Sequence, residues 1–183
     1  MNTPAHMALS LAVLGRSRPG RLWWVILAGA LLPDLAYFIR HLAPGFDGPL
    51  DLAADIFNSA PLYAALLAVG LLSRLPWLTL LTASALLHIA FDLPLHAGDA
   101  HSHFWPFTDW AFESPFSFWD ERHYGRLFGS LEGVLFALAF LAIWRRLETG
   151  WQRALALFGA LIYVATFVHF VGHAWAGAHW AIW

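Results

Sequence analysis

The sequence predicts an all-α fold, a polytopic bundle of transmembrane helices, and its composition is the first reason. Of 183 residues, 60% are hydrophobic and only 12% are charged, whereas soluble domains carry about 25% charged residues. The eleven tryptophans suit a membrane interface, where the indole ring is apolar and its N–H stays wet. Helices are the expected elements because every backbone group must be satisfied within lipid. We expect residues 1–183 to form a single integral membrane domain.

Long apolar stretches are the second reason, because a helix needs roughly 17–25 apolar residues to cross the hydrocarbon core. Four stretches fulfil or nearly fulfil this requirement: Leu22–Ile39, Pro76–Leu95, Leu127–Trp144 and Trp151–His173. A fifth, Ser59–Leu72, is short, and we expect it to be tilted or partly re-entrant. Pro4–Gly15 is too short to span alone, so we expect about five spans preceded by a short helix in a hairpin.

The arginines predict the orientation of these helices, because cytoplasmic loops near helix ends are enriched in basic residues. All ten basic residues are arginine, and seven of them lie in the Arg16–Arg21 turn, at Arg74, and at Arg145, Arg146 and Arg153. We therefore place these connections on the cytoplasmic side of a bacterial-type inner (plasma) membrane. The polar stretches His41–Asn58 and Gly98–Arg126 then form loops on the outer side.

Ionisable residues interrupt the apolar stretches, and such residues usually mark function because a buried charge in the bilayer is costly. His88, Asp92 and His96 are spaced by four residues and share one helix face. Pro94 is expected to kink this helix and free backbone carbonyls near the site. Asp99 and His103 follow directly in the loop.

Other ionisable residues are predicted to reach the same depth in the outer leaflet. At about 1.5 Å per residue, His6 and Asp34 lie roughly 15 and 20 Å from the arginine turn. Glu132 lies in the first turns of its helix, again on the outer side. We therefore predict one shared site in the outer leaflet.

The residue types predict a divalent metal ion as the cofactor. Cysteine is absent, which excludes disulfides, thiolate ligands and a cysteine nucleophile. Imidazole and carboxylate groups then remain as ligands for zinc, manganese or iron, of which we expect zinc. The predicted ligands are His6, Asp34, His88 and Asp92, with His96 and His103 as further candidates. Glu132 and Asp99 are the candidate general bases.

Each residue also has an ordinary structural explanation. A single histidine such as His88 in an apolar helix often forms a hydrogen bond within the core. Asp34 follows Pro33 and can cap the next turn, and Glu132 can pair with Arg126 at the interface. His103 can be a solvated loop residue. The metal interpretation depends on the convergence of these side chains, and no lysine is present to neutralise the acids.

Short motifs in the chain resemble the membrane-bound metal-dependent hydrolases of the YdjM-like family, also described as LexA-binding inner-membrane-associated hydrolases. The resemblance runs from the N-terminus to about residue 145. It rests on Thr3-Pro4-Ala5-His6, Leu32-Pro33-Asp34, His88 with Asp92, Trp105-Pro106-Phe107, and Glu132 near the start of a late helix. It implies a membrane-embedded, metal-dependent hydrolase.

One segment departs from that family's pattern. Members usually carry a His-Arg-x-x-Thr-His-Ser segment. Residues 53–59 read Ala-Ala-Asp-Ile-Phe-Asn-Ser instead, so both histidines are missing. Asp55 or Asn58 is a candidate for one vacated ligand position, and His96, Asp99 and His103 are the other candidates for compensation.

Two classes of function remain open on the sequence. The first is hydrolysis of a phosphoester or other ester of a lipid-like substrate, which would reach the site from the bilayer. The second is a non-catalytic metal-binding or ion- or proton-conducting membrane protein. Haem ligation by histidines such as His88 and His96 fits less well, because haem axial positions rarely need acids. The net charge of −2 provides no basic stripe, so the expected partners are lipids and not nucleic acid.

Overall fold

The computed structural model describes residues 1–15, 20–42 and 47–177. The secondary structure of this part of the chain consists of helices and includes no β-strand. Its seven α-helices are α1 (Thr3–Leu14), α2 (Arg21–Leu42), α3 (Asp47–Phe57), α4 (Ala60–Leu72), α5 (Pro76–Asp92), α6 (Gly125–Trp144) and α7 (Gly150–Ala176). Two short 3₁₀ helices, Leu93–Leu95 and Glu121–His123, flank the long loop before α6. The predicted all-α bundle is confirmed.

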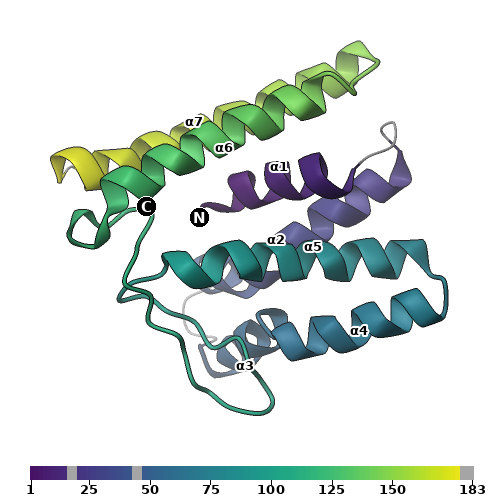
Figure 1. The fold of residues 1–183 in the computed structure, drawn as a ribbon, viewed down its shortest axis with the longest axis horizontal. Helices are drawn as coiled ribbons and strands as arrows, with labels where there is room; N and C mark the ends of the chain where they lie inside the picture. Colours follow the sequence, from purple (N-terminus) through teal and green to yellow (C-terminus); the bar gives the residue numbers. More distant parts are fainter. Residues whose placement is uncertain (16–19, 43–46, 178–183) are drawn as a thin grey trace.

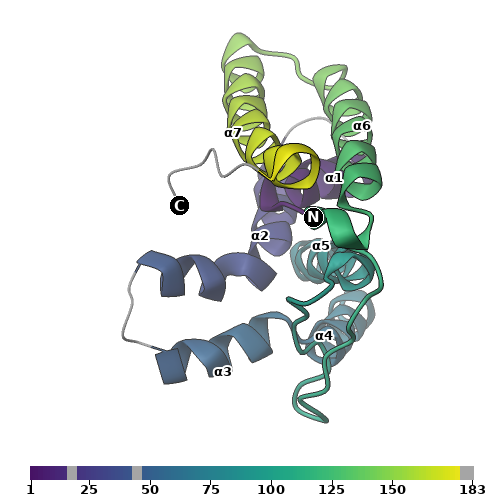
Figure 2. The same cartoon turned by 90° about the vertical axis from the view of Figure 1, so that its left-hand side faces the viewer.

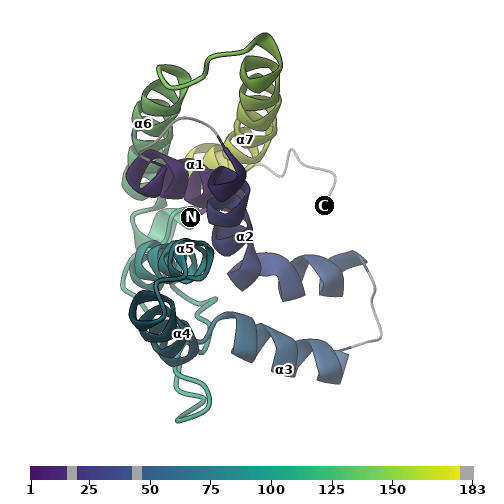
Figure 3. The ribbon, with the colours of Figure 1, turned by 90° about the vertical axis from the view of Figure 1, so that its right-hand side faces the viewer.

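Helix α1 lies at the centre of the bundle and contacts α2, α5, α6 and α7. Figure 1 shows the α6–α7 hairpin on one side of α1, and α2, α5 and α4 on the other. Figure 3 shows the same order from the right-hand side, with α3 extending away from α4. The short N-terminal helix is therefore a core element, although it is too short to cross a bilayer.

Most of the remaining helices are long and apolar enough to span a membrane. Four of the described helices meet the length and hydropathy expected of a span, and a fifth span results if the bent pair α3–α4 is counted as one. Large apolar side chains are exposed on the outer faces of α6 and α7, for example Leu138 and Leu161. Apolar surface of this extent is typical of a protein whose outer face is covered by lipid.

The prediction of a loop over His41–Asn58 is wrong, because α3 occupies most of this stretch. Asp47, Asp51 and Asp55 make the segment look polar, but they alternate with apolar residues at helical spacing. Ala54 is buried, and α3 packs against α2. The axis bends by 49° between α3 and α4, where the Ser59 hydroxyl accepts a hydrogen bond from the Leu62 amide and caps α4.

Helices α2 and α5 approach each other closely, and this contact positions the ionisable side chains that the two helices carry. A Cβ atom on Gly29 would lie 2.2 Å from the Leu81 carbonyl oxygen, so only glycine fits at this crossing. The Ser84 hydroxyl donates a hydrogen bond of 2.7 Å to the Ile26 carbonyl. Small and hydroxyl-bearing residues at a helix interface are the usual means of close packing in membrane proteins.

The turns and loops that connect the helices lie at the two opposite ends of the bundle. Figure 1 shows the turns α4–α5 and α6–α7 at the same end as the last turn of α1 and the first turn of α2. This end carries Arg21, Arg74, Arg145, Arg146 and Arg153, and we call it the arginine end. The predicted turn itself lies largely outside the described residues, since 16–19 are not among them. The long loop before α6 lies at the opposite end.

Candidate metal centre

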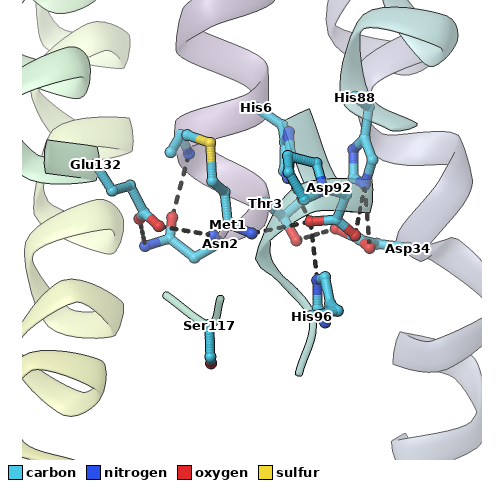
Figure 4. Close-up of polar contacts among 12 residues, drawn as sticks. Met1, Asn2, Thr3, His6, Asp34, His88, Asp92, His96, Ser117 and Glu132 are labelled. Carbon is cyan, nitrogen blue, oxygen red and sulfur yellow. Dashed lines mark hydrogen bonds and ion pairs between the residues drawn. The ribbon is translucent and has the colours of Figure 1, made fainter. Parts of the chain in front are cut away.

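Three buried side chains from two helices meet at the centre of the bundle. His6 of α1 and His88 and Asp92 of α5 each offer one ligand atom, and these atoms lie within 4.8 Å of one another. Only 1–3% of the surface of each residue is exposed. Figure 4 shows the three side chains turned toward one another between the helices. We call these three residues the His–Asp cluster.

His88 is oriented by the backbone of a neighbouring helix. Its Nδ1 donates a hydrogen bond of 2.7 Å to the Ala30 carbonyl oxygen of α2. This bond places the lone pair on Nε2, which is buried and has no hydrogen-bond partner in the described structure. A histidine that binds a metal through one nitrogen usually donates the other to a carbonyl or a carboxylate. The geometry of His88 therefore fits a metal ligand.

His6 lies against His88 with the two rings stacked. Their centroids are 3.7 Å apart and their planes differ by 17°. Nε2 of His6 lies 3.1 Å from Asp92 Oδ1, whereas its buried Nδ1 lacks a hydrogen-bond partner among the described residues. Buried polar atoms are normally satisfied, so unpartnered nitrogens on both rings are consistent with a site built to hold an ion.

Asp34 of α2 lies beside the cluster. Its Oδ1 is 3.5 Å from His88 Nε2, and its other oxygen accepts a hydrogen bond from the Thr3 hydroxyl of α1. About a fifth of the Asp34 side chain is exposed, in contrast to the buried Asp92. The structure thus brings Asp34 next to the cluster, and it is the one of these acids that borders a hollow in the protein.

His96 and Asp99 extend the polar network toward the loop. Nε2 of His96 lies 3.0 Å from Asp92 Oδ1, and its Nδ1 lies 3.1 Å from Asp99 Oδ2. Burial disfavours the charged form of His96, but the two carboxylates outweigh this effect and raise its pKa to about 9. Asp99 also accepts a hydrogen bond of 3.2 Å from the Trp119 indole.

Pro94 ends helix α5 and does not kink it, contrary to the sequence prediction. The α-helix stops at Asp92 and continues as one 3₁₀ turn over Leu93–Leu95. The expected free carbonyl is present, since the Pro94 oxygen accepts a hydrogen bond of 2.6 Å from the Ser114 hydroxyl. This contact fastens the long loop to the end of α5.

Glu132, the first candidate base, is bound to the start of α1. One carboxylate oxygen accepts a hydrogen bond of 3.4 Å from the Asn2 backbone amide, and the other accepts one from the Asn2 side chain. Asn2 in turn caps α1 by accepting from the Ala5 amide at 3.2 Å. Figure 4 shows Asn2 and Met1 between Glu132 and the cluster. Glu132 therefore holds the helix that carries His6.

The proposed pairing of Glu132 with Arg126 is not what the structure shows. Arg126 donates one hydrogen bond of 2.8 Å to Glu121 and another of 2.9 Å to the Ala174 carbonyl oxygen. These contacts join the start of α6 to the end of α7, and leave Glu132 to Asn2.

The residues that were expected to replace the missing histidines have other partners. The Asn58 side chain donates hydrogen bonds of 2.8 and 3.3 Å to the Pro33 and Ala54 carbonyls. Asp55 accepts from the Ser102 hydroxyl at 2.5 Å. His103 is buried and not solvated, and its Nδ1 donates to the Asn58 carbonyl at 3.3 Å. None of them belongs to the His–Asp cluster.

Four contributors to the site were not among the predicted site residues: the Met1 amino group, which donates a hydrogen bond of 2.9 Å to Asp92, Asn2, Thr3 and the Ala30 carbonyl. Asn2 carried a recognisable signal, since an asparagine followed closely by proline is typical of a helix start. The Ala30 carbonyl carried none, because a backbone group has no sequence signature. Thr3 was noted as part of a motif, but its bond to Asp34 depends on the packing of α1 against α2.

Comparisons with known proteins define no family for this chain, since no family model, no curated protein and no solved structure matches it. The fold and the site define a class instead. The chain is an all-helical bundle with four or five helices that fit a membrane. Within it, a buried group of two histidines and one aspartate could hold a metal ion.

Proposed function

We propose that this protein is a membrane-embedded, metal-dependent hydrolase that acts on a phosphoester or another ester of a lipid-like substrate. The observation that carries this proposal is the His–Asp cluster. In the described structure His88 Nε2 and His6 Nδ1 are buried without hydrogen-bond partners, and Asp92 lies 3.1 Å from His6 Nε2 and 3.9 Å from His88 Nε2. The motifs shared with the YdjM-like hydrolases add support, because His6, Asp34, His88 and Asp92 all belong to them.

In this proposal His6, His88 and Asp92 hold a divalent ion, with Asp34 as the fourth ligand and zinc as the expected metal. Such an ion lowers the pKa of a bound water toward about 7 and polarises the scissile bond. Asp34 is the ligand on the open side, since its side chain is partly exposed and borders a hollow. Asp99, the candidate general base, lies on the loop side, where its Oδ2 is 3.1 Å from His96 Nδ1.

The orientation of the site follows from the arginines. If the arginine end is cytoplasmic, the cluster lies in the outer leaflet of the inner membrane. The substrate would then approach sideways from the bilayer, between helices, and not through the long loop.

Ion or proton conduction is the second candidate, and the distribution of ionisable groups favours it less. Within the described helices, the buried ionisable side chains lie toward the loop end: His6, His88, Asp92, Glu132 and His169. The buried polar residues nearer the arginine end are Ser10, Thr82 and Ser84, which have no ionisable group in the physiological range. A continuous relay across the membrane would need such groups along its whole length.

Elemental analysis of the purified, detergent-solubilised protein tests the metal centre. We expect about one divalent ion per chain, and a reduction of tenfold or more in metal affinity in His88→Ala and Asp92→Asn, since loss of even outer-shell partners costs about 10–100-fold. His173→Ala removes a histidine outside the cluster and serves as the matched control. A wild-type protein without bound metal, or one with a haem absorption band, would refute the proposed centre.

A chromogenic screen tests the reaction. Bis-p-nitrophenyl phosphate and p-nitrophenyl acyl esters report phosphoester and carboxylic ester hydrolysis respectively. We expect turnover that chelator removes and added zinc restores. Metal-loaded protein that hydrolyses neither class would leave the non-catalytic alternative as the better description.

A further inference from the structure

Two hollows of different chemistry lie end to end along α1. The first has a volume of about 440 Å³ and is lined by apolar side chains of α1, α2, α6 and α7, apart from Gln152. The second has a volume of about 630 Å³ and is bordered by polar residues, among them Thr3, Asp34, Tyr37 and His101, together with apolar ones. Pro4 borders both hollows. Figure 2 shows the helices that flank them, α7 and α2, on different sides of α1.

The second hollow adjoins the His–Asp cluster through Asp34. This carboxylate borders the hollow and lies 3.5 Å from His88 Nε2. A molecule in the second hollow would therefore present its polar atoms to the cluster. Any part of that molecule that extends toward the arginine end would enter the first hollow.

We propose that the two hollows form one binding groove for a single lipid, with an acyl chain in the apolar hollow and the ester-bearing headgroup beside Asp34. This proposal rests on the proposed function, because it assigns the substrate of the same centre to the membrane phospholipids. We call the apolar hollow the acyl groove, and define it by Leu11, Leu27, Phe140, Leu155 and Gly159.

The distance from the far end of the acyl groove to Asp34 suits one lipid chain. Trp24 borders the groove near the start of α2, and Asp34 lies ten residues further along the same helix. Ten helical residues rise by about 15 Å, which is half of a hydrocarbon core about 30 Å thick. A chain that runs parallel to α2 would thus cover the thickness of one leaflet.

Other occupants fit less well. A helix with its side chains is about 10–12 Å across, so a hollow of about 440 Å³ would admit only about one turn. A small water-soluble ester has no apolar part to match the apolar walls of this groove. Trp24 and Phe158 border the groove and are about 60% exposed, which opens it sideways to the surrounding lipid.

Photocrosslinking in lipid nanodiscs tests the groove directly. The probe is phosphatidylglycerol with a diazirine in the middle of one acyl chain, and the cross-linked peptides of the full chain are mapped by mass spectrometry. We expect cross-links on residues 4–11 of α1, because Ala8 and Leu11 are buried beneath the groove. Lipids that merely surround the protein would reach the exposed apolar side chains, such as those of α4, α6 and α7, and not the buried residues Ala8 and Leu11.

A matched pair of variants separates the groove from the general lipid surface. At Gly159 a Cβ atom meets nothing within 4 Å, so Gly159→Phe fills the groove without a backbone clash. We expect this variant to lose the cross-links on α1. Leu161→Phe adds the same side chain on an exposed, lipid-facing position of α7, and should retain them.

Metal analysis on the same samples keeps the two proposals distinguishable. Absence of α1 cross-links in the wild type, or their persistence in Gly159→Phe, would overturn the groove even if the metal is present. Cross-links that follow the expected pattern in a protein without metal would support the groove and refute the hydrolase. Cross-linked dimers in place of lipid adducts would assign the groove to a second copy and overturn the proposal.

Discussion

The orientation of His88 is set by a carbonyl of another helix, and this detail decides its chemistry. A neutral histidine whose Nδ1 donates to a backbone oxygen presents Nε2 as an acceptor. In the apolar core this nitrogen faces Asp34 and Asp92 at 3.5 and 3.9 Å, beyond hydrogen-bond distance. Asp92 also accepts a hydrogen bond of 2.9 Å from the amino group of Met1, so a metal ion bound by Asp92 would compete with this ammonium for the carboxylate.

The two candidate bases differ in what they contact, and this difference predicts the effect of removing each. Asp99→Asn should keep the metal and reduce turnover by about 10²–10⁴-fold, the usual contribution of acid–base catalysis. Glu132→Gln should instead weaken metal binding, because Glu132 holds Asn2 and thereby the helix of His6. Metal occupancy and chelator-sensitive hydrolysis are measured for both. Full metal occupancy with lost turnover in Glu132→Gln, and normal turnover in Asp99→Asn, would reverse the assignment.

Asp120 in the loop before α6 predicts a pH dependence of stability. Hydrogen bonds from Arg122 hold the pKa of its carboxyl well below the usual range, and His123 contributes a further contact. Because the folded pKa is lowered, the contribution to stability is complete above the unfolded value of about 3.9 and disappears as the pH falls below it.

We therefore expect Asp120→Asn to lower the thermal stability of the detergent-solubilised protein at pH 7. The difference from wild type should narrow at pH 3. Thermal unfolding followed by tryptophan fluorescence measures both. An equal difference at the two pH values would show that the carboxylate charge is not what stabilises the loop.

At the scale of elements, both ends of α1 are held in place, one by α6 and the other by the turn that follows α6. Its first turn is held by Glu132 through Asn2. Its last turn is capped by the Arg146 guanidinium, which donates to the carbonyls of Leu11, Ala12 and Gly15 at 2.8–3.3 Å. Carbonyls at a helix C-terminus have no partners within the helix, and a cation there also interacts favourably with the helix dipole.

Arg146→Ala should destabilise the protein by about 1–3 kcal/mol, the range for hydrogen bonds that involve a charged group. Arg145→Ala is the matched control, since this neighbouring arginine is exposed and the change in charge is the same. Midpoints of chemical unfolding in detergent compare the two. Equal destabilisation by both variants would attribute the effect to net charge and not to the cap.

The close crossing of α2 and α5 predicts that Gly29→Ala damages the site from a distance. The added methyl would overlap the Leu81 carbonyl, and overpacking of this kind costs about 1–3 kcal/mol. It would also move Ala30 away from His88, so metal occupancy should fall together with stability. Gly159→Ala, where a Cβ atom meets nothing, is the control. Unchanged occupancy in Gly29→Ala would show that His88 does not depend on this crossing.

At the scale of the whole molecule, the arginine end and the loop end predict opposite labelling. The chain contains no cysteine, so single cysteines can be introduced without background. In intact cells, a membrane-impermeant maleimide should label Asp109→Cys in the long loop and leave Ser73→Cys between α4 and α5 unlabelled. Both positions are exposed. The reverse pattern would place the cluster in the inner leaflet.

The elements themselves were largely predictable, and the exceptions have physical reasons. A transmembrane helix forms its backbone hydrogen bonds within one segment, so an apolar run of sufficient length is enough to indicate it, as for α2, α5, α6 and α7. Helix α3 was not predicted, because its aspartates make the segment look polar. Its apolar face is buried only through the contact with α2. A proline at position 94 can either kink α5 or end it. In the structure the helix ends before Pro94, and the Pro94 carbonyl accepts a hydrogen bond from the Ser114 hydroxyl.

The sequence alone therefore determined the helical segments other than α3, and that imidazoles and carboxylates from several of them lie at similar depths. Only the tertiary structure decided which of them touch. His6 stacks on His88, Glu132 binds Asn2, and His103 binds the Asn58 carbonyl. The physical reason is that depth follows from the rise per residue along one helix, whereas contact depends on the rotation and packing of helices far apart in the chain. These are set by close fits such as that of Gly29 against Leu81.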